Sequence, residues 1–149
     1  MMFDQAKTDD PPFDHGRLLD VLARADAVRL TALAETLLPL LDAVEVVQSR
    51  TGLVMLPMRD TVQGTDFHLG EVLVAEAHLR ATGCEGYGMV LGRDLERAMA
   101  MAVVDAATAC LGQTPAISAF LHSEAAAQAA ADTACLQAIE ATRVDMETF

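Results

Sequence analysis

The spacing of apolar residues changes twice along this chain, and that change constrains the fold more than any other feature. From residue 14 to about 39, and again from 94 to about 141, apolar residues recur three or four positions apart, as on one face of a helix. Between residues 44 and 91 they fall into short runs separated by turn residues, which indicates strands. The pattern predicts an α+β fold, in which an antiparallel sheet of about four strands packs with N-terminal and C-terminal helices.

The region before the strands carries the signals for two short helices. Asp14 and Asp26 can each cap a helix N-terminus, and Pro39 ends the stretch because proline lacks a backbone donor and clashes with the preceding turn. The same residues also fit one bent helix. Residues 1–13 contain several Asp and Pro residues and predict a flexible tail, which leaves residues 14–149 as a single domain.

The strand region begins with two predicted strands, residues 44–48 and 53–58, joined by a turn at residues 49–52. Pro57 places the second of them at a sheet edge or a bulge. Residues 67–80 alternate as a half-buried strand does, but their Ala, Glu and Leu content suits a helix equally well. One face of that alternation carries Leu69, Leu73, Ala75, Ala77 and Leu79.

A turn at residues 83–88 is predicted to lead into a last short strand, in which Tyr87, Met89 and Leu91 alternate with small or apolar residues. The short connections between these strands favour an antiparallel meander.

Two helices are predicted after the strands. The first follows the cap residue Asp94 and ends before Gly112, and its apolar residues on two sides predict that it is covered on both. The second opens at Pro115 and continues to about residue 141, with a break near Ser123 as an alternative. Its alanine-rich faces suit close packing on another chain.

The charge balance disfavours two classes of ligand. The formal net charge is −12, which argues against nucleic acid and against an anionic membrane surface. A mean hydropathy of +0.28 is high, yet no apolar run approaches the roughly 20 residues that span a bilayer. Apolar surface buried against partner subunits explains this, and an alanine-rich core is the alternative. No basic start precedes an apolar segment at the N-terminus, so we expect a cytoplasmic protein.

The cysteines are three in number and have no paired spacing, so they indicate neither a disulfide framework nor a zinc site. Cys110 and Cys135 lie among small apolar residues and are expected to be core thiols. The histidines fall in separate predicted elements, so they are not expected to form a metal site: His15, His68, His78 and His122. No hydrolase elbow, phosphate-binding loop or metalloprotease motif is present.

Several blocks of the sequence together resemble the PhnG family of the bacterial carbon–phosphorus lyase system. Each block is weak alone, but they occur in the family's order and at close to its spacing, and the resemblance covers about residues 14–149. The blocks are residues 51–55 with Arg59, residues 67–71, residues 86–94 leading to residues 105–106, and residues 141–145.

The resemblance implies a function within a complex. Such proteins assemble with PhnH-, PhnI- and PhnJ-type subunits, and PhnG, PhnH and PhnI together replace the adenine of ATP by methylphosphonate, giving ribose 1-methylphosphonate 5-triphosphate. The chemistry is usually credited to the PhnI-type partner, so this chain would be a non-catalytic or assisting subunit with no cofactor of its own, and an oligomer. The family fold is α+β, which selects a strand for residues 67–80. The alternative is a divergent paralogue that serves as a self-associating scaffold or small-ligand binding protein.

The resemblance also nominates site residues. Arginine forks suit phosphonate oxygens, and Arg59, Arg93 and Arg143 match family blocks. The alternative is that each forms a structural ion pair with one of the acidic candidates, which are Glu71, Asp94, Asp105 and Asp145. Asp94 serves equally well as a helix cap. Three glycines are expected where the backbone needs positive φ or close approach: Gly52, Gly70 and Gly92.

The chain departs from the family pattern at several positions. His68, Glu76, Arg97 and Met99 stand where family members commonly carry other residues, and Glu76 reverses a charge. If those positions touch ligand in the family, the contact is lost or altered here. Otherwise they belong to an interface that has changed together with a partner.

Overall fold

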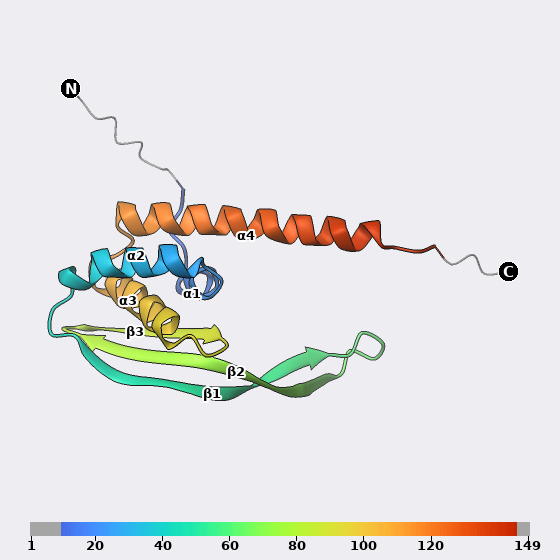
Figure 1. Ribbon diagram of the computed structural model, residues 1–149, viewed down its shortest axis with the longest axis horizontal. Helices are drawn as coiled ribbons and strands as arrows, with labels where there is room; N and C mark the ends of the chain where they lie inside the picture. Colours follow the sequence, from blue (N-terminus) through green and yellow to red (C-terminus); the bar gives the residue numbers. More distant parts are fainter. Residues whose placement is uncertain (1–9, 146–149) are drawn as a thin grey trace, which may run out of the picture.

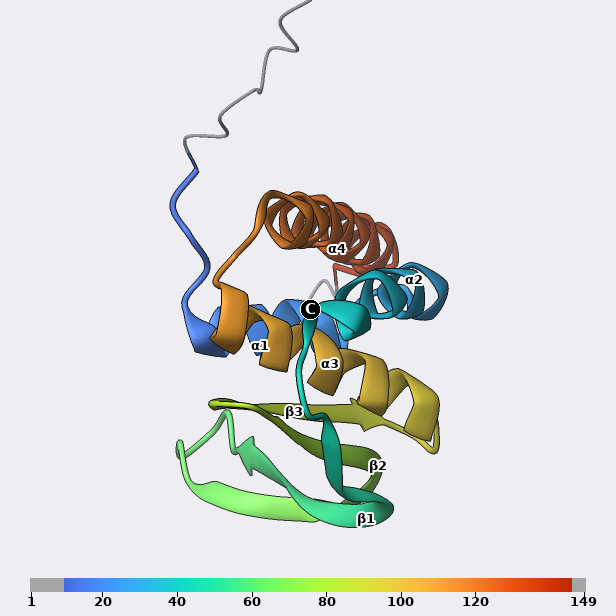
Figure 2. The same ribbon diagram turned by 90° about the vertical axis from the view of Figure 1, so that its left-hand side faces the viewer.

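A computed structural model describes residues 10–145 and has an α+β architecture, as predicted. The antiparallel sheet forms one layer, on which α3 packs with α1 beside it; α2 packs on α3, and α4 lies on the far side of those helices (Figures 1 and 2). The sheet has three strands rather than about four. The elements are α1 (His15–Ala23), α2 (Ala27–Leu37), a 3₁₀ turn (Leu38–Leu40), β1 (Glu45–Arg59), β2 (Asp66–Ala81), β3 (Cys84–Leu91), α3 (Leu95–Leu111) and α4 (Pro115–Ala141).

Each α-helix begins at a side-chain cap, and the sequence indicates three of the four. The cap oxygen accepts a hydrogen bond from the backbone N–H three residues later, which satisfies a donor that the helix itself leaves free. α1 and α2 are separate helices and not one bent helix. The four cap residues are Asp14, Asp26, Asp94 and Thr114.

The predicted turn at residues 49–52 is wrong, because β1 runs without interruption through it. Thr51 lies opposite Ala75 and Gly52 opposite Val74, so pairing with the continuous strand β2 overrides the local turn preference. The prediction for Pro57 is confirmed: β1 is an edge strand, and its register shifts between Leu56 and Pro57.

Strand β2 confirms the strand interpretation of residues 67–80, and Ala75, Ala77 and Leu79 are buried as the alternation predicts. Leu69 on the same predicted face is 61% exposed, because the far half of β2 extends beyond the helices. β2 and β3 are joined by a two-residue turn, which is shorter than the predicted turn.

The apolar residues of β3 predict that Tyr87, Met89 and Leu91 face the core, but the structure buries the other face. Gly86, Gly88 and Val90 are buried, whereas Tyr87, Met89 and Leu91 are exposed. A Cβ atom on Gly88 would collide with the carbonyl oxygen of Ala98 in α3, and one on Gly86 with that of Ala102. The two glycines therefore let α3 lie directly against the sheet.

The middle of α3 is buried on all sides, from Ala100 to Ala107, which confirms the prediction that this helix is covered on both sides. Helix α4 is continuous, and no break occurs near Ser123. Its buried residues all lie in its first half: Ile117, Phe120, Leu121 and Glu124. Over residues 10–145, no helix combines the length and apolar character needed to cross a membrane.

The cysteines differ from the prediction. Cys84 at the start of β3 and Cys110 at the end of α3 are joined as a disulfide, with their Cα atoms 5.7 Å apart. Cys110 and Cys135 are both exposed, so the expectation of core thiols is wrong. Residues 1–9 of the predicted tail lie outside the described residues. Phe13, the last residue of that tail, packs against the core and exchanges two hydrogen bonds with the side chain of Gln113.

Candidate functional site

The arginines matched to the family lie at the ends of different elements. Arg59, at the end of β1, donates to the carbonyl of Gly64 at 3.0 Å and lies 3.5 Å from Asp66. Arg143, just after α4, pairs with Glu140 at 3.0 Å and with Asp145 at 3.9 Å. All of these side chains are largely exposed, and pairs of this kind contribute little to stability.

The remaining candidates on the sheet side do not complete an anion site. Glu71 lies exposed on β2, and Arg93 lies exposed in the loop before α3. Neither forms an ion pair within residues 10–145. Asp94 caps α3 by accepting from the N–H of Arg97 at 2.9 Å. Of the ion pairs considered from the sequence, the structure contains Arg143 with Asp145, and Arg59 pairs with Asp66 and not with Glu71.

The structure confirms the expectation for one of the three glycine candidates and contradicts it for the other two. Gly92 has φ of +99°, a conformation that favours glycine, as expected. The expectation is not met at Gly52 or Gly70, since neither has a positive φ and a Cβ at either position would meet nothing within 4 Å. The glycines that the packing requires, Gly86 and Gly88, differ from those two because they face a helix.

Asp105 is the one acidic candidate that is buried. It lies on α3 with a side chain only 4% exposed, accepts from the backbone N–H of Tyr87 at 2.9 Å, and lies 2.8 Å from Nε2 of His15. A buried carboxylate needs such partners, because leaving one unpaired costs several kcal/mol. Asp105 therefore joins α3 to β3 and α1, which is a structural arrangement.

A second buried acid, Glu124, was not singled out by the sequence. Its side chain is 4% exposed, lies 2.7 Å from the guanidinium of Arg29 and accepts from the N–H of Asp26 at 3.3 Å. It thereby joins α4 to the start of α2. Its position three residues after Leu121, on the buried stripe of α4, was the available signal.

The positions where the chain departs from the family pattern have structural contacts of their own. Arg97 donates to the carbonyls of Ala23 and Ala25 at 3.0 and 2.9 Å, which satisfies acceptors at the end of α1. Glu76 pairs with Arg50 across the sheet at 3.1 Å. Met99 packs against the core, and His68 lies exposed opposite Pro57.

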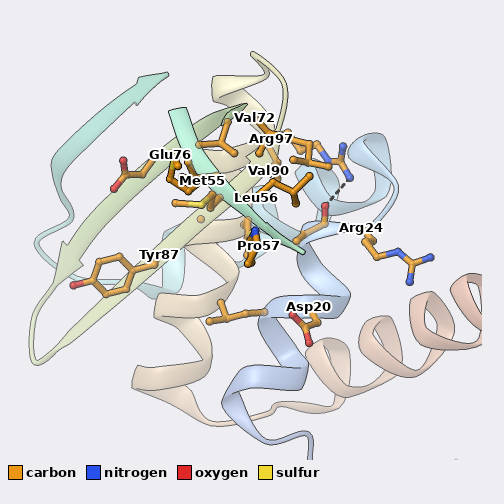
Figure 3. Close-up of a pocket in the computed structure, with 18 residues that line it drawn as sticks. Asp20, Arg24, Met55, Leu56, Pro57, Val72, Glu76, Tyr87, Val90 and Arg97 are labelled. Carbon is orange, nitrogen blue, oxygen red and sulfur yellow. Dashed lines mark hydrogen bonds between the residues drawn. The ribbon is translucent and has the colours of Figure 1, made fainter. Parts of the chain in front are cut away.

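A cavity of about 840 Å³ opens between α1, α3, the far part of β1 and strand β3. We call it the edge groove, and it is bounded by residues 19–24, 54–57 and 87–91 with parts of β2 and α3. Figure 3 shows Met55, Leu56, Val72 and Val90 gathered near one another, with Glu76 and Tyr87 to one side of them. Its lining is mainly apolar, and Asp20 and Arg24 lie on the α1 side.

The polar groups beside the groove have shifted pKa values that local pairing explains. Partial burial, and then the nearby Glu85 carboxylate, raise the pKa of Tyr87. A hydrogen bond from Arg80 lowers the pKa of Glu85. The Tyr87 ring stacks on His78 at a centroid distance of 4.2 Å. These contacts hold one end of the exposed sheet face in place.

Two regions carry exposed apolar side chains, and the first of them shares residues 54–57 with the edge groove. The distal hairpin, defined as residues 53–71, and the outer half of α4, defined as residues 129–141, both extend to the same side of the molecule (Figure 1). Every residue of the outer half of α4 is exposed. The large exposed apolar residues are Leu53, Met55, Leu56, Met58, Val62, Phe67 and Leu69 in the hairpin, and Leu136 and Ile139 in the helix.

Within residues 10–145, no three His, Cys, Asp or Glu side chains are grouped so that they could hold a metal ion. The buried polar groups join secondary-structure elements, and many of the exposed apolar side chains lie in the edge groove, the distal hairpin and the outer half of α4. Exposed apolar surface of this extent is typical of proteins that bind other macromolecules. Fold and surface together define a small α+β protein of the class that binds other macromolecules.

The chain belongs to the PhnG family: the family model described as "Phosphonate metabolism protein PhnG" matches residues 15–149. It is also similar to the alpha-D-ribose 1-methylphosphonate 5-triphosphate synthase subunit PhnG of Rhizobium meliloti (strain 1021). The two sequences are 34% identical, over 99% of this chain and 97% of that protein.

Proposed function

We propose that this chain is an assisting subunit of an α-D-ribose 1-methylphosphonate 5-triphosphate synthase, in which adenine is displaced from ATP by methylphosphonate. The observation that carries the proposal is the full-length similarity to a subunit of that synthase. The partners are expected to be PhnI-, PhnH- and PhnJ-type subunits, and the catalytic groups are expected on the PhnI-type partner. A cytoplasmic location is part of this proposal, because ATP is the expected substrate.

The chemistry of the reaction supports an assisting role. Displacement at an anomeric carbon develops positive charge on the sugar, so the site needs carboxylates near the ring and cations for the triphosphate and phosphonate groups. In the described residues, Arg59, Arg93 and Arg143 belong to three separate element ends, and the buried acids Asp105 and Glu124 already bind groups of this chain. A complete site then requires groups from other subunits.

The exposed apolar regions are the surfaces through which this chain would bind those subunits. The outer half of α4 buries none of its residues, and Asp132 near its start pairs with Arg24 at 2.6 Å. It presents small side chains, which let a partner helix approach closely. Burial of Leu136 and Ile139, now 66% and 61% exposed, would stabilise such a contact. A homo-oligomer is a second arrangement that the same surfaces permit.

Adenine release from ATP in the presence of methylphosphonate tests the proposal. The PhnI- and PhnH-type subunits from the same source should release adenine only when this chain is added, and they should co-purify with its tagged form. Equal adenine release without this chain, or a monomer that ignores both subunits, would contradict it.

The edge groove favours a second candidate, a binding protein for a small apolar ligand outside the pathway. Its volume of about 840 Å³ lies within the range of small-molecule sites. Growth on methylphosphonate as the phosphorus source separates the two functions. A strain lacking this chain should fail to grow if the chain is a synthase subunit, and it should grow normally if the chain only binds such a ligand.

A further inference from the structure

Strand β3 has one edge without a partner strand. The N–H of Gly92 donates to the carbonyl of Leu73, and the register then continues through Val90 opposite Ala75 and Gly88 opposite Ala77. In an antiparallel ladder alternate residues point their N–H and C=O groups toward the neighbouring strand. The backbone groups of Tyr87, Met89 and Leu91 therefore point away from β2.

This edge is closed at one end and open at the other. The N–H of Tyr87 is bound by the buried carboxylate of Asp105. No such partner is present for the backbone of Met89 or Leu91 within residues 10–145, and these residues are 42% and 75% exposed. The open part of the edge thus offers two N–H donors and two carbonyl acceptors in a row.

The open edge lies along the edge groove. Residues 87–91 line the groove on one side, and residues 54–57 of β1 line it on another, because the long hairpin curves around (Figures 2 and 3). A strand placed beside β3 would hydrogen-bond to Met89 and Leu91 and would direct every second side chain into the apolar groove.

The charges around the groove indicate which charge the residues at the ends of such a strand would carry. This chain carries a formal net charge of −12, and Asp20 on the groove has no ion-pair partner among the described residues. The other charged groups of the lining are bound: Arg24 to Asp132, Glu76 to Arg50, and Arg97 to backbone carbonyls. A basic residue near Asp20 would therefore meet an uncompensated carboxylate.

We propose that the edge groove binds an extended segment of a partner subunit, which adds to β3 as a fourth strand. The segment has apolar residues at alternate positions and a Lys or Arg at a flank. This inference rests on the proposed function, since it names how a subunit of the synthase would be bound. A small apolar ligand could fill the groove, but it would leave the donors and acceptors of Met89 and Leu91 without partners.

Amide hydrogen exchange on the complex purified with the PhnI- and PhnH-type subunits tests this directly. The amides of Met89 and Leu91 should exchange rapidly in the isolated chain and at least about 100-fold more slowly in the complex. Protection that appears in the isolated chain and rises with its concentration would show that a second copy occupies the edge, which overturns the assignment to a partner subunit.

A pair of proline variants tests the same point by binding. Met89→Pro removes an N–H from the free edge of β3, where proline does not interrupt the existing ladder, and should weaken partner binding about tenfold or more. Thr51→Pro is the matched control. The register places its N–H on the free edge of β1, away from the groove, so binding should be unchanged. Circular dichroism and thermal unfolding check that both variants fold.

The outcomes separate the two proposals. If the natural chain co-purifies with the subunits while the Met89 and Leu91 amides stay unprotected and Met89→Pro binds normally, the strand-addition inference is wrong and the synthase assignment stands. If the natural chain binds none of the subunits, the strand-addition inference and the synthase assignment are both wrong. Binding that is lost in Met89→Pro alone, with protection of both amides, supports strand addition.

Discussion

The two halves of helix α4 have similar alanine-rich sequences and opposite surroundings. The first half buries Ile117, Phe120 and Leu121 against the other helices, and Gln128 near its end donates to the carbonyl of Val21 at 2.9 Å. The outer half, residues 129–141, has no buried residue and continues as helix into solvent (Figure 1). Alanine favours helix in both halves, but only the first half is fixed by packing.

The sheet shows the same contrast. The half of β2 nearest β3 buries Ala75, Ala77 and Leu79, whereas the half within the distal hairpin exposes Phe67 and Leu69. In both elements the packed part determines the fold of the isolated chain, and the projecting part contributes apolar surface that the fold does not use. Substitutions should therefore affect stability in the packed parts and assembly in the projecting parts.

The largest effect is expected where α3 meets β3. Gly88→Ala places a methyl group against the backbone of Ala98, which neither element can move away from cheaply, and should lower the free energy of unfolding by on the order of 4 kcal/mol. Gly70→Ala in the distal hairpin meets nothing and should change it by less than about 1 kcal/mol. Urea unfolding of both variants measures the difference. Similar losses at the two sites would contradict the close helix–strand approach.

A pair of leucines compares the two halves of α4 directly. Leu121 is fully buried and Leu136 is 66% exposed, so Leu121→Ala should destabilise the isolated chain by about 3 kcal/mol and Leu136→Ala by less than about 0.5 kcal/mol. In a co-purification assay, Leu136→Asp should reduce recovery of the PhnI-type subunit while thermal unfolding stays unchanged. Full recovery with that variant would remove the outer half of α4 from the interface.

A smaller effect is expected from the buried acid of α4. Glu124→Gln removes the charge that pairs with Arg29, and because Arg29 is half exposed and can be rehydrated, the loss should be about 2 kcal/mol. Glu140→Gln in the outer half alters a pair in which both side chains are more than two-thirds exposed, and should change stability by less than about 0.5 kcal/mol. Thermal unfolding at neutral pH distinguishes the two. Equal changes would show that the burial of Glu124 does not matter.

The smallest effect is a pH dependence that comes from the surface. The hydrogen bond from Arg24 lowers the pKa of Asp132 below 3.8, and that from Arg80 lowers the pKa of Glu85 below 4.5. Because these carboxylates have lower pKa values in the folded chain, they stabilise it at pH above the unfolded values and lose that contribution as pH falls through the folded ones. Asp132→Asn should flatten the fall of the melting temperature between about pH 5 and pH 3. A slope that is unchanged in this variant would rule out Asp132 as a contributor.

Much of the fold follows from local chemistry that the sequence displays. The caps Asp14, Asp26 and Asp94 begin the helices they predict, because a cap needs only the next three residues to form its hydrogen bond. The alternation of Ala75, Ala77 and Leu79 likewise marks the buried face of β2. The family blocks add the strand interpretation of residues 67–80, for which the composition alone left helix and strand open.

The candidate site was less predictable, because it depends on which elements meet. Asp105 could be nominated from its family block, but its two hydrogen-bond partners come from α1 and β3, 90 and 18 residues away in the chain. The glycines show the same dependence. Gly86 and Gly88 differ from Gly52 and Gly70 only in facing α3, and nothing in the adjacent sequence marks that difference.

The sequence by itself determined the order of the helical and strand regions, the helix starts and the buried face of β2, because each depends on a few neighbouring residues. Only the tertiary structure decided that residues 49–52 continue a strand, that β3 turns its glycines and not Tyr87 and Met89 to the core, and that the edge groove forms. The physical reason is that pairing and packing between distant segments contribute more free energy than local turn or burial preferences, and they can reverse them.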